Sequence, residues 1–114
     1  MTKKRAERLL GADIEVRLNP DVPGYIFAYA DGIGVGEKTE DKAIEALVQA
    51  VYAVRSRSVM YKAKNRCERC GRLTELQAHH KQFRSHGGTH TEENLEAVCQ
   101  SCHDKEHKRK KGKT

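Results

Sequence analysis

Hydrophobic and polar positions in the first half of the chain alternate with two different periods. Residues 13–18 alternate at every second position, and residues 25–30 and 33–36 are apolar runs separated by Asp31 and Gly32. These patterns predict three strands and a hairpin turn. After Thr39, a helix-capping residue type, apolar residues recur at helical spacing and predict a helix from about residue 40 to the middle fifties or beyond. Its apolar positions are Ile44, Leu47, Val48, Val51 and Val54.

Three further features of this half carry no chemistry of their own. Residues 1–8 are charged and are expected to fray, and the basic residues 55–66 are interpreted as a connector running past a backbone-binding surface. The aromatic row Tyr25, Phe27 and Tyr29 is interpreted as packing rather than a base-stacking platform, because alternation serves packing first. Residues 1–62 are therefore interpreted as a small β-β-(β)-α accessory segment without an assigned role.

The composition limits how such a chain stays folded. Hydrophobic residues make up 37% of the chain and charged residues 33%, with no Trp, so four Cys and six His indicate metal as reinforcement. Residues 1–62 hold ten Lys/Arg against nine Asp/Glu, and residues 63–114 hold twelve against seven. This excess predicts a polyanionic partner or, more simply, a solvated basic tail. No secretory or membrane-spanning pattern is present, so a cytoplasmic location without a membrane partner is expected.

The four cysteines form two C-x2-C pairs with 28 residues between them. Two thiolates at this spacing can bind one cation from a tight turn, and two such turns complete a tetrahedral zinc site. Disulfides are rare in the cytoplasm, and a redox-active C-x2-C usually opens a helix after a strand. Structural Zn²⁺ is therefore predicted, and it closes residues 71–98 into a loop. The ligands are Cys67, Cys70, Cys99 and Cys102.

A second group of residues lies within this loop and just after it. His79 and His80 are adjacent, Asn94 follows His80 by 14 residues, His103 follows by nine more, and His107 by four. Framed by four cysteines, this pattern resembles the HNH endonuclease family (the ββα-metal superfamily), and its last two histidines are similar to those of the nuclease colicins. The resemblance covers residues 67–107. It implies an α+β chain in which residues 63–114 form a zinc-stapled ββα-metal domain with a basic tail.

The resemblance also implies a role for each histidine. His79 binds the catalytic metal and His80 is the general base, and neighbours on a strand point to opposite sides, so the two cannot easily share one ion. An imidazole with a pKa near ~6.5 can accept a proton at neutral pH. His103 and His107 are i and i+4 on a helix, so they share one face and, with His79, can hold one divalent ion.

The remaining family features concern the loop and the metal. Asn94 is expected to bond backbone across residues 81–93 and so set the angle of His80. Many family members have Asp where His79 stands and Pro shortly after the base, and this chain has neither. Imidazole ligands favour Zn²⁺ or Ni²⁺ more than carboxylates do, so Mg²⁺, Mn²⁺, Ni²⁺ and Zn²⁺ all stay open as the catalytic ion.

The family implies hydrolysis of phosphodiester bonds in DNA, expected to be double-stranded and held without sequence readout. Small HNH proteins are frequent in phages and mobile elements. Two alternatives stay open: a non-catalytic zinc-knuckle protein that binds nucleic acid, and a structural or antitoxin-like partner protein. His86 and His90 match no motif position and are interpreted as loop residues. The expected backbone contacts are Arg84, Lys105, Lys108, Arg109, Lys110 and Lys111.

Overall fold

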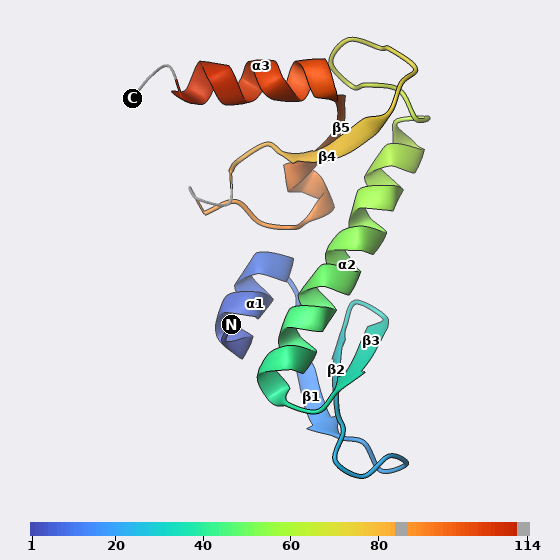
Figure 1. Cartoon of the computed structure of the whole chain (residues 1–114), viewed down its shortest axis with the longest axis vertical. Helices are drawn as coiled ribbons and strands as arrows, with labels where there is room; N and C mark the ends of the chain where they lie inside the picture. The colour runs from blue at the N-terminus through green and yellow to red at the C-terminus, as the bar shows by residue number, and fades with distance from the viewer. Residues whose placement is uncertain (84–86, 112–114) are drawn as a thin grey trace. The chain divides into compact units, whose positions relative to one another are not determined.

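A computed structural model describes the backbone of residues 1–83 and 87–111 and the side chains of residues 1–83 and 87–105 (Figure 1). By internal contacts the chain divides into an N-terminal unit, residues 1–54 with 89–91, and a C-terminal unit, residues 55–88 with 92–114. Strands and helices occur in both units, so the predicted α+β class is confirmed. No helix among the described residues is long and apolar enough to cross a membrane.

The chain begins with a helix, α1 (Lys3–Leu10), where fraying was expected. That expectation is wrong because both helix ends are capped. The Thr2 hydroxyl accepts a hydrogen bond from the Arg5 N–H, and Gly11 ends the helix in the left-handed region at φ 63°. Ala6 and Leu10 lie one turn apart and are fully buried, so apolar packing also holds the helix.

Three antiparallel strands follow in the order β1-β2-β3, and they match the three predicted strands closely. Their bounds are β1 (Glu15–Leu18), β2 (Ile26–Ala30) and β3 (Ile33–Glu37). One face of the sheet packs into the apolar core of the N-terminal unit through residues such as Ala28 and Ala30. On the other face, a Cβ on Gly34 would meet the Tyr29 ring, and one on Gly36 would meet the Phe27 ring. Phe27 and Tyr29 therefore pack across strands, as predicted for the aromatic row.

Helix α2 (Glu40–Lys62) begins at the predicted position and continues further than its apolar spacing suggests. The Thr39 hydroxyl accepts a hydrogen bond from the Lys42 N–H at the first turn. Arg55 and Val59 are still buried, so the buried stripe extends into the segment interpreted as a connector. That interpretation is wrong for residues 55–62, which are helical; the helix ends before Lys64 and Asn65, both in the left-handed region.

The C-terminal unit contains a β-hairpin followed by a helix, the predicted ββα arrangement (Figure 1). Strands β4 and β5 pair antiparallel, with Leu76 opposite Cys99 and His80 opposite Leu95. A short 3-10 helix, η2, leads into β5, and α3 starts directly after it. The bounds are β4 (Leu76–His80), η2 (Glu92–Asn94), β5 (Leu95–Cys99) and α3 (Gln100–Lys111).

Candidate metal centre and motif histidines

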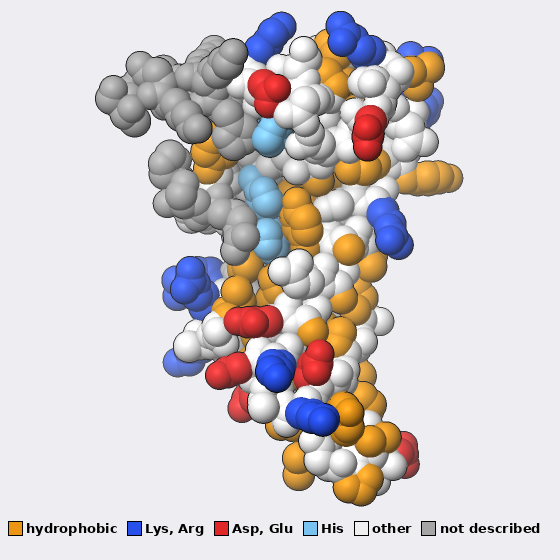
Figure 2. All heavy atoms as spheres, in the orientation of Figure 1, with side chains coloured by type: hydrophobic (Ala, Val, Ile, Leu, Met, Phe, Trp, Pro, Cys, Tyr) orange, Lys and Arg blue, Asp and Glu red, His pale blue; other side chains and the backbone are white. Residues whose placement is uncertain are grey.

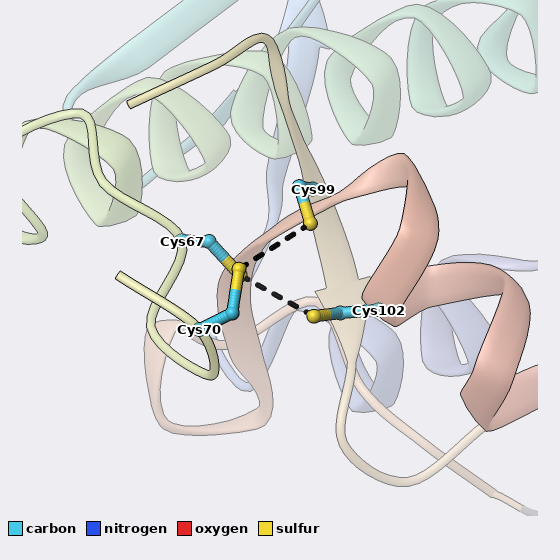
Figure 3. A group of neighbouring side chains, drawn as sticks. All are labelled: Cys67, Cys70, Cys99 and Cys102. Atoms are coloured by element: carbon cyan, nitrogen blue, oxygen red, sulfur yellow. Dashed lines mark hydrogen bonds between the residues drawn. The ribbon is translucent and has the colours of Figure 1, made fainter. Parts of the chain in front are cut away.

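The two cysteine pairs converge on one point in the C-terminal unit (Figure 3). Cys67 and Cys70 lie on the turn after α2, whereas Cys99 ends β5 and Cys102 lies in the first turn of α3. The four sulfur atoms lie within 4.8 Å of one another, and all four cysteines are free thiols. The Cys67–Cys102 and Cys70–Cys99 sulfur pairs are both 3.7 Å apart.

These distances fit a tetrahedral zinc ion. Zinc–sulfur bonds of about 2.3 Å place the sulfur atoms of a regular tetrahedron about 3.8 Å apart. Two sulfur pairs at 3.7 Å reproduce two of these edges, and a disulfide would require sulfur atoms at about 2.05 Å. The donor set is also suitable, because four thiolates prefer a borderline-soft cation such as Zn²⁺. The cluster can therefore hold a structural metal ion.

The acid–base chemistry of the cluster also favours a cation. Burial is the largest single influence on Cys67 and raises its pKa, but backbone N–H groups of Cys99, Cys70 and Arg69 outweigh it and lower the pKa to about 6. The Cys102 N–H likewise lowers the pKa of Cys99. The Cys99 side chain, which has the largest influence, and burial together raise the pKa of Cys102 to about 12. A central divalent ion would remove the repulsion that prevents full ionisation.

The first cysteine turn is fastened to β5 by the two residues between its ligands. The Glu68 N–H donates to the Ala97 carbonyl oxygen at 2.9 Å, and the Glu68 carboxylate accepts from the Ala97 N–H at 2.5 Å. The Arg69 guanidinium donates twice to the Glu96 carboxylate, at 3.0 and 2.5 Å. Because Glu96 is the cross-strand partner of His79, the cysteine turn and the motif histidine are held on the same pair of strands.

His79 and His103 lie together beside the cysteine cluster. His79 is 2% exposed on β4, and its ring centre lies 5.3 Å from that of His103 on α3, with the rings nearly perpendicular. Two imidazoles that bind one cation at about 2.0–2.1 Å place their ring centres roughly 5 Å apart. The His79 Nε2 and His103 Nδ1 atoms are both shielded from solvent. The pair therefore has a spacing that suits two ligands of one ion.

His80 is half-buried at the end of β4, opposite Leu95. Strand alternation places its side chain on the face opposite to that of His79. The following residue continues the pairing of the two chain segments, because the Lys81 N–H donates to the Asn94 carbonyl oxygen at 2.7 Å. His80 therefore stands where the strand ends and the long loop begins.

The Asn94 side chain bridges the two ends of that loop. Its Oδ1 accepts from the Gln82 N–H at 2.8 Å, and its Nδ2 donates to the Gln82 carbonyl oxygen at 3.1 Å. These two bonds agree with the contact expected of Asn94 and lie two residues after His80. They tie the backbone of Gln82 to Asn94 across the loop.

Several residues named from the sequence fall outside the described part of the chain. Arg84 and His86 lie in the undescribed segment 84–86, and the side chain of His107 is undescribed although its backbone is part of α3. Lys105 is exposed on α3. His90 is a loop residue, but it is 4% exposed, and its ring lies 4.5 Å from the Tyr52 ring in the N-terminal unit. The other residues whose side chains are undescribed are Lys108, Arg109, Lys110 and Lys111.

Sequence reasoning missed a set of residues that hold the loop from outside the motif. Ser58 and Lys62 on α2 both donate to the Glu92 carboxylate, at 3.0 and 2.9 Å. Glu92 opens η2, two residues before Asn94. These partners are 30 or more residues apart in the chain, so no local pattern could reveal the contact.

Comparison with known families agrees with this arrangement. The family model described as HNH endonuclease matches residues 67–109, which contain both cysteine pairs, the His79–His80 pair, Asn94, His103 and His107. The resemblance inferred from the sequence is therefore confirmed for this segment, with its cysteine cluster placed to bind a metal ion. No curated protein and no solved structure gave a match to the chain.

Proposed function

We propose that the chain is a metal-dependent endonuclease that hydrolyses phosphodiester bonds in DNA, expected to be double-stranded. The observation that carries the proposal is the approach of His79 and His103 to 5.3 Å inside a segment that matches an endonuclease family. In this scheme His79 and His103, with His107, bind one divalent ion. Held there, the cation would supply positive charge beside the scissile phosphate and the leaving 3′-oxygen.

His80 is the proposed general base. Its imidazole takes a proton from water, the water oxygen attacks phosphorus, and the P–O3′ bond breaks to leave a 5′-phosphate and a 3′-oxyanion, which takes a proton from solvent to become a 3′-hydroxyl. Asn94 is a positioning residue in this scheme, because its two bonds to Gln82 hold the backbone beside His80. The four cysteines hold a structural Zn²⁺ that fixes the start of α3, where His103 directly follows Cys102. Lys105 and the basic residues Arg84, Lys108, Arg109, Lys110 and Lys111 hold the DNA backbone.

Two kinds of substitution separate the proposed base from the proposed ligands. His80→Ala should fold, retain its zinc and bind DNA, while plasmid cleavage falls by at least ~10²-fold, the scale expected for loss of a general base. His79→Ala and His103→Ala should weaken binding of the catalytic metal, so excess Mg²⁺, Mn²⁺, Ni²⁺ or Zn²⁺ should restore part of their activity. The measurement is plasmid nicking at increasing metal concentration, with DNA binding and zinc content measured on the same samples.

His86→Ala is the matched control, a histidine of the same segment that stands outside the motif, and should cleave like the native protein. Equal rescue of His80→Ala and His79→Ala by metal would show that the assigned roles are wrong. If the native protein binds DNA but cleaves none with any of these metals, the non-catalytic zinc-knuckle function is favoured instead.

A further inference from the structure

The last two turns of α2 present a basic and aromatic stripe to solvent. At 100° per residue, Arg57 and Tyr61 fall on one side of the helix axis, and the buried residues Arg55 and Val59 fall on the other. Tyr61 is 81% exposed, which is unusual for so large an aromatic side chain. Nothing in the proposed catalytic scheme uses this stripe.

The turn after α2 extends the stripe with the exposed Lys64 and two arginines. The Arg66 N–H donates to the Ala63 carbonyl oxygen at 3.1 Å, which folds the chain back tightly at the end of the helix. Arg66 then pairs across an isolated bridge with Leu73, which is 64% exposed and follows the exposed Arg72. We call this surface the α2 basic patch; its members are Arg57, Tyr61, Lys64, Arg66, Arg72 and Leu73.

The charge of the α2 basic patch is not neutralised within the described protein. Its four cations form no ion pair with a described residue within 4.0 Å. The neighbouring Lys62 and Arg69 differ, because they bind Glu92 and Glu96. Figure 2 shows Lys and Arg side chains, an acidic side chain and a protruding hydrophobic side chain where α2 ends in the C-terminal unit. Four cations that form no ion pair within the described part of the chain, on the helix end and turn that also carry an exposed aromatic ring, are a combination that binds sugar–phosphate backbones.

We propose that the α2 basic patch is a second DNA-binding surface. It contacts a part of the duplex backbone other than the part bound at the histidine site. This proposal rests on the proposed function, because the α2 basic patch and the histidine site bind the same DNA molecule. The cations contact phosphates, while the Tyr61 hydroxyl can donate to a phosphate oxygen and its ring can cover an adjacent sugar. Such a surface raises affinity without sequence readout, because each phosphate contact releases condensed counterions.

The salt dependence of DNA binding tests the proposal directly. The protein is the whole 114-residue chain with His80→Ala, so that duplex binding can be measured by fluorescence anisotropy without cleavage. A patch variant replaces Arg57, Lys64, Arg66 and Arg72 with Gln, and a control variant replaces Lys3, Lys4, Arg8 and Lys42, which are exposed in the N-terminal unit, with Gln. Both lose four charges, so a general change in net charge affects them equally.

The slope of log K against log salt should become about 3–4 units shallower for the patch variant, close to 0.9 for each lost phosphate contact. The control variant should keep the parent slope, and Tyr61→Ala should weaken binding more than Tyr61→Phe. Equal slopes in the two variants, or a parent that does not bind duplex DNA, would overturn the proposal. Dimerisation lost only in the patch variant, without a change in slope, would instead show a contact between copies. If the salt slope depends on the patch but the native protein never cleaves DNA, the proposed nuclease function is wrong and the proposed DNA-binding surface still holds.

Discussion

At the scale of single residues, the long loop depends on one position that cannot carry a side chain. A Cβ on Gly88 would overlap the carbonyl oxygen of Gln82, and the Gly88 N–H donates to the Phe83 carbonyl oxygen at 2.9 Å. The same Gln82 carbonyl accepts the Asn94 amide at 3.1 Å. Close approach of backbone to backbone, rather than an unusual dihedral angle, therefore requires glycine here.

Gly88→Ala should push residue 82 away from Asn94 and disturb the backbone beside His80. We expect a loss of about 1–3 kcal/mol in the free energy of unfolding, the usual cost of overpacking, and a several-fold fall in plasmid cleavage. Gly24→Ala is the control, because Gly24 has φ 84° and a Cβ added there would meet no atom within 4 Å. It should lose about 1 kcal/mol through backbone strain alone and cleave normally. Equal cleavage by the two variants, in samples that urea unfolding shows to be folded, would contradict this account of the loop.

At the scale of elements, α2 holds the short helix that carries Asn94. The Lys62 ammonium, which has the larger influence, and the Ser58 hydroxyl both stabilise the Glu92 carboxylate, so the pKa of Glu92 lies below its usual value of 4.5. A lowered folded-state pKa means that this contact stabilises the protein above the unfolded-state pKa and is lost as the pH falls through the folded-state value. The Glu92 side chain is 36% exposed, so the contribution is at most about 1 kcal/mol.

Glu92→Gln should therefore destabilise the protein slightly at pH 7, and the difference from native should shrink as the pH falls below the usual pKa of 4.5 and vanish below the folded-state pKa of Glu92. It should also lower the cleavage rate, because η2 loses its attachment to α2 and Asn94 shifts. Glu93→Gln, a change of an exposed neighbour, is the matched control. Thermal unfolding across pH, together with cleavage rates, measures both effects. Recovery of cleavage in the charge-swapped pair Lys62→Glu and Glu92→Lys would show that the contact, rather than either residue alone, positions the loop.

Sequence reasoning recovers the elements that have either a periodic apolar pattern or a motif of fixed residue spacing. The alternation of residues 13–18 and the paired cysteines are local signals, and they led to β1 and to the cysteine cluster. Helix α1 was missed because its charged sequence hides two buried residues, Ala6 and Leu10, whose burial depends on distant partners. The end of α2 was left open for the same reason, because Arg55 continues the buried stripe where a periodic apolar pattern would need a hydrophobic residue.

At the scale of the whole molecule, the two units differ in what stabilises them. The N-terminal unit has ten buried apolar residues in one cluster, including Leu10, Ile44, Leu47 and Val51. Among the described residues of the C-terminal unit, six apolar residues are buried: Val59, Cys67, Leu95, Ala97, Val98 and Cys99. Two of these six are cysteines of the cluster and Val98 packs against them, so half of the buried apolar residues of the C-terminal unit lie in one cluster with the proposed zinc ligands.

Loss of the metal should therefore unfold one unit and spare the other. The purified protein should contain one Zn²⁺, and Cys99→Ser should lose it together with the structure of β4, β5 and α3, because ligand binding supplies much of the folding free energy of so small a unit. Hydrogen exchange of the full chain should show lost protection in these elements and retained protection in β2, β3 and the first turns of α2, whose core contains none of the four cysteines. Ser101→Ala, an exposed position between the ligands of the second pair, should behave like the native protein. A C-terminal unit that stays protected without bound metal would show that its apolar packing is sufficient and that the cysteine cluster is not a structural zinc site.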